Sequence, residues 1–174
     1  MNKLVRTSAV AGFFSAAVIL SVGLAPTASA AVQAGTTQLV DANGMCLGSW
    51  LGRTDTQAIQ WDCNTNNDQE WSFQWMGSDS GWGSYYRITN NDGQCLGING
   101  ASTASGAYGT VWDCNGNNDQ LWYYQQGSNG WGGLVNRNSK MCLGSQDGSN
   151  QPGAWQIQWS CNGNNDQLWK QKTW

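Results

Sequence analysis

Short stretches that mix apolar and polar residues recur between residues 36 and 172, with turn residues between them. The segments 58–61 (Ala-Ile-Gln-Trp) and 108–112 (Tyr-Gly-Thr-Val-Trp) have the length and composition of short strands. Asn43-Gly44 and Asp92-Gly93 are dipeptides that favour tight turns. No part of this region carries apolar residues at a sustained helical spacing. The pattern therefore predicts an all-β protein of short strands and many turns.

Three sequence signatures recur in the same order in three copies. The first is Cys-Leu-Gly, at 46–48, 95–97 and 142–144. The second is Trp-x-Cys, at 61–63, 112–114 and 159–161. The third is Asn-Asn-Asp-Gln-x-Trp, at 66–71, 117–122 and 164–169. An apolar residue lies seven positions before the first cysteine of each copy (Leu39, Ile88 and Val135).

The spacing of these signatures defines three repeats that fill one domain. The first cysteines of the copies are 49 and then 47 residues apart. We expect copy 1 at about 36–82, copy 2 at 83–131 and copy 3 at 132–174. One copy is too small to bury its own apolar face, so the three copies must share a core.

The first 30 residues have the features of a secretory signal peptide. Lys3 and Arg6 give a basic start, residues 9–24 are apolar, and 28–30 (Ala-Ser-Ala) place small residues where a signal peptidase cuts. The apolar run is shorter than the roughly 20 residues that span a bilayer. We therefore expect residues 1–30 to be removed, and residues 31–174 to form one secreted, extracellular domain without membrane insertion.

All six cysteines lie in the predicted mature part, which indicates disulfides in an oxidising compartment. Six cysteines permit fifteen pairings. The repeat selects one of them, because pairing like with like gives Cys46–Cys63, Cys95–Cys114 and Cys142–Cys161. Each pair closes a loop of about 18 to 20 residues and contributes roughly 3 kcal/mol in the chain-entropy model.

Charge and composition narrow the classes of function. Without Lys3 and Arg6, six basic residues face eleven acidic ones, a net charge of −5, which disfavours nucleic acid and anionic membranes as partners. The chain has no histidine, so the commonest general base, the usual zinc ligand and any Ser-His or Cys-His nucleophile pair are missing. Twelve tryptophans and many Asn, Gln and Ser residues suit a neutral ligand rich in hydroxyl groups.

Together, the three signatures resemble the ricin-type β-trefoil lectins, also known as R-type lectins or family 13 carbohydrate-binding modules. The resemblance covers residues 36–172 and is closest to small secreted bacterial members. It implies a β-trefoil of about twelve short strands with a pseudo-three-fold axis. It also implies up to three shallow sugar sites, one in each copy.

Two kinds of tryptophan are expected to have different roles. The tryptophans of Gln-x-Trp (Trp71, Trp122 and Trp169) would fill the shared core. The glutamines of that motif (Gln69, Gln120 and Gln167) would hydrogen-bond the turn that carries them, and Gln120 and Gln167 are also candidate sugar contacts.

The resemblance assigns the tryptophans of Trp-x-Cys (Trp61, Trp112 and Trp159) to platforms for the apolar face of a sugar. Alternatively, each covers the adjacent disulfide. A second aromatic residue, Tyr108 or Trp155, precedes the platform by four positions, a spacing that keeps both on one face of a strand. Copy 1 has Gln57 there, although Trp50 could compensate.

The polar contacts depart from the family pattern. The family's Asp after Cys-Leu is replaced by Gly48, Gly97 and Gly144, and its Gln two residues before the platform by Ile59, Thr110 and Ile157. Its Asn before the Gln of Gln-x-Trp is replaced by Asp68, Asp119 and Asp166. Either the carboxylate has moved across the site and still accepts two sugar hydroxyls, or this Asp caps the local turn.

Other features carry less weight. The segments 81–83 and 130–132 (Gly-Trp-Gly) lie between copies, where their tryptophans either tie loops to the barrel or serve as further recognition residues. Residues 64–68 look like a calcium loop but lack its alternation of ligands, so a turn is expected.

These observations favour a non-catalytic protein that binds neutral poly- or oligosaccharides, with no cofactor and no metal. The alternative is a scaffold that binds a secreted protein partner, a reading favoured by the missing Asp. An enzyme is disfavoured, because a glycosidase needs two carboxylates in unlike surroundings and the three repeated aspartates are equivalent.

Overall fold

The computed structural model describes residues 35–49, 56–127 and 129–173. The predicted signal peptide, residues 1–30, and Trp50 lie outside this part of the chain. Among the residues described, no helix is long and apolar enough to cross a membrane.

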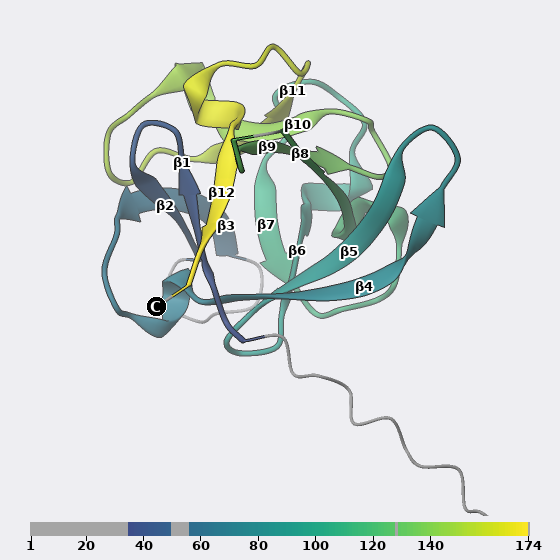
Figure 1. Cartoon of the computed structure of the whole chain (residues 1–174), viewed down its shortest axis with the longest axis horizontal. Coiled ribbons are helices and arrows are strands. Elements are labelled where there is room, and N and C mark those ends of the chain that lie inside the picture. Colours follow the sequence, from purple (N-terminus) through teal and green to yellow (C-terminus); the bar gives the residue numbers. More distant parts are fainter. Residues whose placement is uncertain (1–34, 50–55, 128, 174) are drawn as a thin grey trace, which may run out of the picture. The chain divides into compact units, whose positions relative to one another are not determined.

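Twelve strands confirm the expected all-β architecture, and four of them fall in each copy (Figure 1). Copy 1 holds β1 (Gln38–Asp41), β2 (Met45–Ser49), β3 (Thr56–Asp62) and β4 (Trp71–Asp79). Copy 2 holds β5 (Gly83–Asn90), β6 (Cys95–Ile98), β7 (Gly109–Trp112) and β8 (Leu121–Gln126). Copy 3 holds β9 (Gly132–Asn136), β10 (Cys142–Ser145), β11 (Gln156–Trp159) and β12 (Trp169–Lys172).

Short 3₁₀ helices join several of these strands. Three of them are the Asn-Asp-Gln segments of the third signature: η2 (Asn67–Gln69), η4 (Asn118–Gln120) and η6 (Asn165–Gln167). Two more, η3 (Asn99–Ala101) and η5 (Gln146–Gly148), follow β6 and β10.

The first and last strands of the copies form a closed barrel. Antiparallel pairs join β1 to β12, β12 to β9, β9 to β8, β8 to β5 and β5 to β4. A bridge between Thr37 and Trp71 returns from β4 to the start of β1 and completes the ring. Because the ring is closed, it leaves no unpaired barrel edge.

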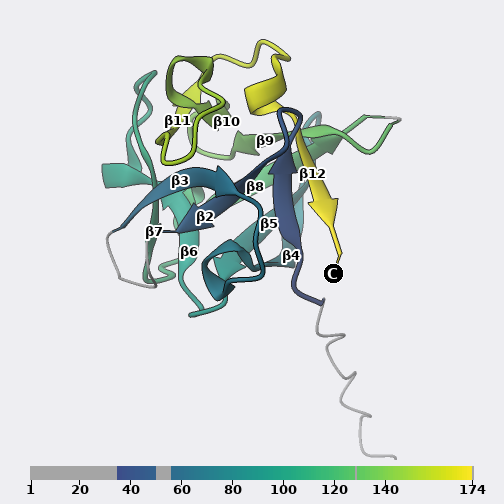
Figure 2. The same cartoon turned by 90° about the vertical axis from the view of Figure 1, so that its left-hand side faces the viewer.

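The middle strands of each copy form hairpins that cap one end of this barrel (Figures 1 and 2). Strand β2 pairs with β3, β6 with β7 and β10 with β11. The hairpins meet in a three-fold ring of equivalent pairs: Gln57 with Thr110, Tyr108 with Ile157, and Trp155 with Ile59. The fold is therefore the predicted β-trefoil.

The expected core tryptophans are fully buried in one shared apolar cluster, which confirms that prediction. Each indole N–H donates to the carbonyl of the leucine after the first cysteine of its own copy. The distances are 2.9 Å for Trp71 to Leu47, 2.8 Å for Trp122 to Leu96 and 3.0 Å for Trp169 to Leu143. Each ring thus fills the core and also anchors its cap hairpin to the barrel.

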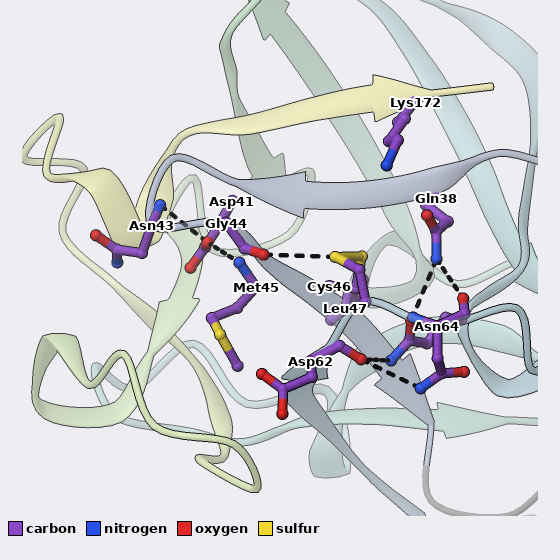
Figure 3. The surroundings of a disulfide bond; sticks show 12 residues. Gln38, Asp41, Asn43, Gly44, Met45, Cys46, Leu47, Asp62, Asn64 and Lys172 are labelled. Atoms are coloured by element: carbon purple, nitrogen blue, oxygen red, sulfur yellow. Dashed lines mark hydrogen bonds between the residues drawn. A yellow bond between two sulfur atoms is a disulfide. The ribbon is translucent and has the colours of Figure 1, made fainter. Parts of the chain in front are cut away.

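The three disulfides are those that the repeat predicts: Cys46–Cys63, Cys95–Cys114 and Cys142–Cys161. Figure 3 shows the first of them, with the Cys63 sulfur 3.4 Å from the carbonyl oxygen of Gly44. Each disulfide joins the start of a cap hairpin to the loop that follows the same hairpin.

One position in the predicted repeat was wrong. Leu39 and Ile88 are in the core, but in copy 3 the equivalent residue is Leu134, and Val135 lies in a separate cluster with Tyr123 and Cys142. The β9–β10 turn has one more residue than its equivalents, with Lys140 at a positive φ of 63°. That extra residue moves the apolar position from seven to eight residues before the cysteine.

A cluster of charged and aromatic residues fastens the long β4–β5 hairpin to the other copies. Asp79 accepts two hydrogen bonds from Arg137 (2.8 and 3.1 Å) and one from Tyr123 (2.5 Å). Trp82 stacks on Tyr123 at 5.3 Å, and Lys140 lies over both rings. Trp82 therefore ties its loop to the barrel. Mainly through Arg137, the contacts lower the pKa of Asp79 to about 2, so the ion pair persists until the pH approaches that value.

We predict that Trp122→Ala lowers the free energy of unfolding by about 3–5 kcal/mol, because it opens a cavity in the core and leaves the Leu96 carbonyl unpaired. Trp112 belongs to the same copy but is 45% exposed, so Trp112→Ala should lower the free energy of unfolding by less than about 1 kcal/mol. Urea unfolding with the disulfides intact measures both values. Equal losses for the two variants would contradict the assignment of core and surface tryptophans.

Candidate functional site

The candidate platform tryptophans lie at or near the ends of the second hairpin strands, opposite the first cysteine of each copy. Trp61 pairs with Cys46, Trp112 with Cys95 and Trp159 with Cys142. The three rings nevertheless keep 39%, 45% and 47% of their surface exposed. Each ring therefore lies beside a disulfide and still presents apolar surface to solvent.

The glutamine of the third signature holds the loop after each platform. In copy 1, the Gln69 side chain accepts from the Asn64 N–H at 2.9 Å and donates to the Asp62 carbonyl at 2.9 Å. Gln120 and Gln167 make the equivalent bonds in copies 2 and 3. In copy 1, Gln38 also donates to the Asn64 carbonyl at 2.7 Å (Figure 3). These hydrogen bonds confirm the predicted turn role of the glutamines. They use both the amide oxygen and the amide nitrogen of each side chain.

The aspartates that precede these glutamines face the glycines that follow Cys-Leu. A methyl group added at Gly48 would lie 3.3 Å from an Asp68 carboxylate oxygen, and one at Gly97 would lie 3.5 Å from that of Asp119. At Gly144 the corresponding distance to Asp166 is only 2.6 Å. The carboxylate thus lies close to the place where a side chain after Cys-Leu would begin, and the glycines make room for it.

Burial raises the pKa of the Asp68, Asp119 and Asp166 carboxyls above the ordinary value of 3.8. The backbone N–H of each aspartate opposes this rise, and the Ser145 N–H also does so for Asp166. A low-dielectric environment disfavours the charged form, so desolvation outweighs these hydrogen bonds. These contacts are local to the loop and the adjacent hairpin, as a capping role would also require.

In copies 2 and 3, the tryptophan and the aspartate line the same depression. The copy 2 depression has a volume of about 370 Å³, and Trp112, Thr110, Asp119 and Gln120 are among the residues that line it. The remaining lining residues of this depression are Gly97, Ile98, Asn99, Gly100, Ala101, Asn115 and Asn117. A flat aromatic ring, a carboxylate and several side-chain amides thus meet in one open cavity.

The copy 3 depression, of about 250 Å³, has the same design. Trp159, Ile157, Asp166 and Gln167 are among the residues that line it. Asp147 adds a second carboxylate to its lining, at a backbone φ of 57°. In copy 1, the residues equivalent to η3 and η5 fall within 50–55, outside the described part of the chain, so Trp50 stays untested as a substitute.

The additional aromatic residues Tyr108 and Trp155 contact each other across two copies. Their rings are perpendicular, 5.0 Å apart, and 37% and 45% exposed. Tyr108 shares a cavity with Trp112, as the spacing of four suggests. Trp155 is not among the residues that line the copy 3 depression with Trp159.

Contacts between copies were not predicted from the sequence. The buried Gln60 donates to the carbonyls of Ser149 and Gln151, at 2.8 and 2.9 Å. Gln158 does the same to Ser102 and Ala104, at 2.9 and 2.8 Å. Both glutamines directly precede a platform tryptophan, and this Gln-Trp dipeptide is the signal that could have drawn attention to them. Each glutamine thus holds a loop of another copy beside the platform tryptophan that follows it in the sequence.

No group of three or more Asp, Glu, Cys or His side chains that could hold a metal ion occurs within residues 35–49, 56–127 and 129–173. The loop at residues 64–68 forms a turn, in which the Asn66 N–H donates to the Asn64 side chain at 2.8 Å.

The fold is a β-trefoil, and comparison with known proteins agrees with this assignment. The model of the ricin-type β-trefoil lectin domain matches residues 35–169. The chain therefore belongs to the ricin-type β-trefoil lectin family. A lectin domain of this kind is, in general, a carbohydrate-binding domain. A search of curated proteins finds no match.

Solved structures share the fold. ThreeFoil, a designed three-fold symmetric protein, is 27% identical with a TM-score of 0.72, over 80% of this chain and 99% of that protein. An exo-β-1,3-galactanase from Clostridium thermocellum is 26% identical with a TM-score of 0.71, over 80% of this chain but only 30% of the galactanase. The Rhizoctonia solani agglutinin is 16% identical with a TM-score of 0.69, over 81% and 96% of the two chains, and shows the fold alone.

The fit between glycine and aspartate predicts a graded response to added methyl groups. Gly144→Ala should lower the free energy of unfolding by about 1–3 kcal/mol, because the new carbon would lie 2.6 Å from Asp166 and 2.7 Å from Gln167. Gly48→Ala should change it by less than about 1 kcal/mol, because its nearest contact is 3.3 Å and alanine reduces the freedom of the unfolded chain. Urea unfolding compares the two, and equal losses would contradict the difference in fit.

Proposed function

We propose that this chain is a secreted, non-catalytic carbohydrate-binding protein that binds neutral poly- or oligosaccharides through up to three shallow sites. The observation that carries the proposal is the shared lining of the copy 2 and copy 3 depressions by an exposed tryptophan and a carboxylate. Trp112 with Asp119 and Trp159 with Asp166 form the two main sites. Trp61 and Asp68 are the corresponding residues of copy 1.

The chemistry of these residues suits a sugar. The C–H face of a pyranose ring can lie on an indole, and a carboxylate accepts hydrogen bonds from two adjacent hydroxyls. Asn115 and Asn117 line the same cavity in copy 2, as Asn162 and Asn164 do in copy 3, and can add polar contacts. Gln120 and Gln167 would act mainly as walls, since their amides already hold the loops.

The proposal has no catalytic step because the repeated aspartates lie in equivalent surroundings and the copy 2 depression contains Asp119 as its one carboxylate, while Asp147 adds a second one in copy 3 alone. A glycosidase relies on two carboxyl groups whose pKa values are pushed apart. Burial instead raises the pKa of Asp68, Asp119 and Asp166 alike.

Secretion is supported by the three disulfides, which persist in an oxidising compartment, and by the sequence of residues 1–30.

The test uses the chain expressed with its own N-terminal segment and recovered from the culture medium. Its measured mass should equal that of a chain that starts at Ala31. On an array of neutral glycans and polysaccharides, including β-1,3-galactan, the protein should be retained. The double variant Trp112→Ala/Trp159→Ala should bind about tenfold or more weakly, since the loss of an aromatic contact of about 1.5 kcal/mol corresponds to that factor.

Trp75→Ala is the matched control, because Trp75 is 61% exposed and does not line either depression. It should leave retention unchanged. Folded protein that binds no glycan would contradict the proposal. It would favour instead a scaffold for a protein partner, a role for which the exposed Trp75 and Met76 on the β4–β5 hairpin would provide contact surface.

Binding should weaken as the pH falls, with a midpoint above 3.8. Asp119 and Asp166 accept hydrogen bonds from sugar hydroxyls more strongly when ionised than when protonated, and burial raises the pKa of both. Protonation of these buried groups does not itself oppose folding, because a raised pKa means that the folded state holds the proton more tightly than the unfolded state. Protonation of Asp119 and Asp166 therefore weakens sugar binding without unfolding the protein.

The double variant Asp119→Asn/Asp166→Asn supplies the comparison for this pH profile. It should bind more weakly than the natural chain at pH 7 and show a flat profile between pH 7 and pH 4. Titration calorimetry with the best glycan from the array measures both. If the variant retained full affinity, the aspartates would be turn caps and not sugar contacts.

A further inference from the structure

The copy 2 depression does not end at its platform. A second cavity, of about 350 Å³, lies next to it and shares Asn99, Thr110 and Trp112 with it. Tyr108, Gly109 and Gln57 form the rest of its lining. The two cavities are therefore adjacent along strand β7, with the platform tryptophan belonging to both.

This second cavity leads toward the ring where the three hairpins meet. Gln57 comes from copy 1 and pairs with Thr110 of copy 2. Tyr108 forms a β-bridge with Ile157 of copy 3. Its ring is perpendicular to the Trp155 ring, with the two centroids 5.0 Å apart. Side chains of all three copies thus continue the surface that begins at Trp112.

The exposed aromatic residues along this path can each accept one sugar face. Trp112, Tyr108 and Trp155 are 45%, 37% and 45% exposed. Every residue lining the second cavity is uncharged, and Asn99 offers a side-chain amide that can hydrogen-bond hydroxyls. A path with aromatic faces and neutral polar groups fits a linear chain of neutral sugars better than a charged ligand.

We propose that copy 2 binds several consecutive units of a linear neutral polysaccharide, from the Trp112–Asp119 depression across Tyr108 toward Trp155. This inference rests on the proposed sugar binding and deepens it: the ligand of copy 2 is a stretch of polymer, and a single terminal unit fills only its first part. Tyr108 is the residue that extends the site.

Copy 1 supplies the substitution that tests this role. The position of Tyr108 holds Gln57 in copy 1, so Tyr108→Gln introduces a side chain that the same place in the fold already accommodates. Tyr108→Phe is the matched control, because it keeps the ring. Both are made in the full chain carrying Trp61→Ala and Trp159→Ala, so that copy 2 is the remaining complete site.

Titration calorimetry measures the affinity for xylose, glucose and galactose and for their linear oligosaccharides of two to six units. With Tyr108 in place, affinity should rise about tenfold between one and three units of the sugar that binds. Tyr108→Gln should remove this rise and leave the affinity for the single unit within about twofold. Tyr108→Phe should keep the rise, and thermal unfolding confirms that each variant is folded.

The possible failures are distinguishable. If the natural chain, folded, binds none of these sugars or oligosaccharides, the proposed function and this inference both fail for these ligands. If it binds single units as tightly as trimers, or if Tyr108→Gln keeps the rise with chain length, the extended site is wrong and the single-unit sites stand.

Discussion

The hydrogen bond from a buried indole N–H to the carbonyl after Cys-Leu is the contact on which the rest of this molecule depends. It occurs three times, at 2.8 to 3.0 Å, and joins a barrel strand or its start to a cap hairpin inside the core. A carbonyl left unpaired at this depth would cost about 1–3 kcal/mol. The contact therefore fixes the hairpin relative to the barrel and, with the disulfide, fixes the platform tryptophan, which pairs with the cysteine directly before the bonded leucine.

The same short motif organises the binding depression. Within Asp-Gln-x-Trp of copy 2, Trp122 anchors the hairpin, Gln120 closes the loop and Asp119 faces Gly97. Gly97 directly follows the leucine whose carbonyl receives the indole bond. Core, loop and carboxylate are therefore positioned by one segment, and burial of the carboxylate opposes its charge.

The three-fold repeat made much of the core and of the disulfide pattern predictable, because equivalent residues of the copies have equivalent surroundings. Burial of Trp71, Trp122 and Trp169 and the disulfide pairing followed from it, and the trefoil followed from the resemblance to ricin-type lectins that the repeated signatures carry. The error at Val135 arose where copy 3 has one extra turn residue, so that counting back from Cys142 lost the register. The exposed platforms were also expected, while their role in sugar binding stays a prediction.

Contacts between unlike copies could not be predicted in this way, because a repeat says nothing about which residues of different copies meet. The clamps made by Gln60 and Gln158 are of this kind, and copy 2 has Val111 at the equivalent place. The pair of Tyr108 with Trp155 is another.

The copies differ from one another at the ring where their hairpins meet. Gln57, Tyr108 and Trp155 are equivalent by sequence, and each bridges to the next copy around the same ring. The ring therefore carries one glutamine, one tyrosine and one tryptophan, and the tyrosine and tryptophan rings contact each other with their centroids 5.0 Å apart. The extended site proposed for copy 2 depends on this asymmetry, because only copy 2 has a tyrosine at this position, while the barrel strands remain arranged in three equivalent copies.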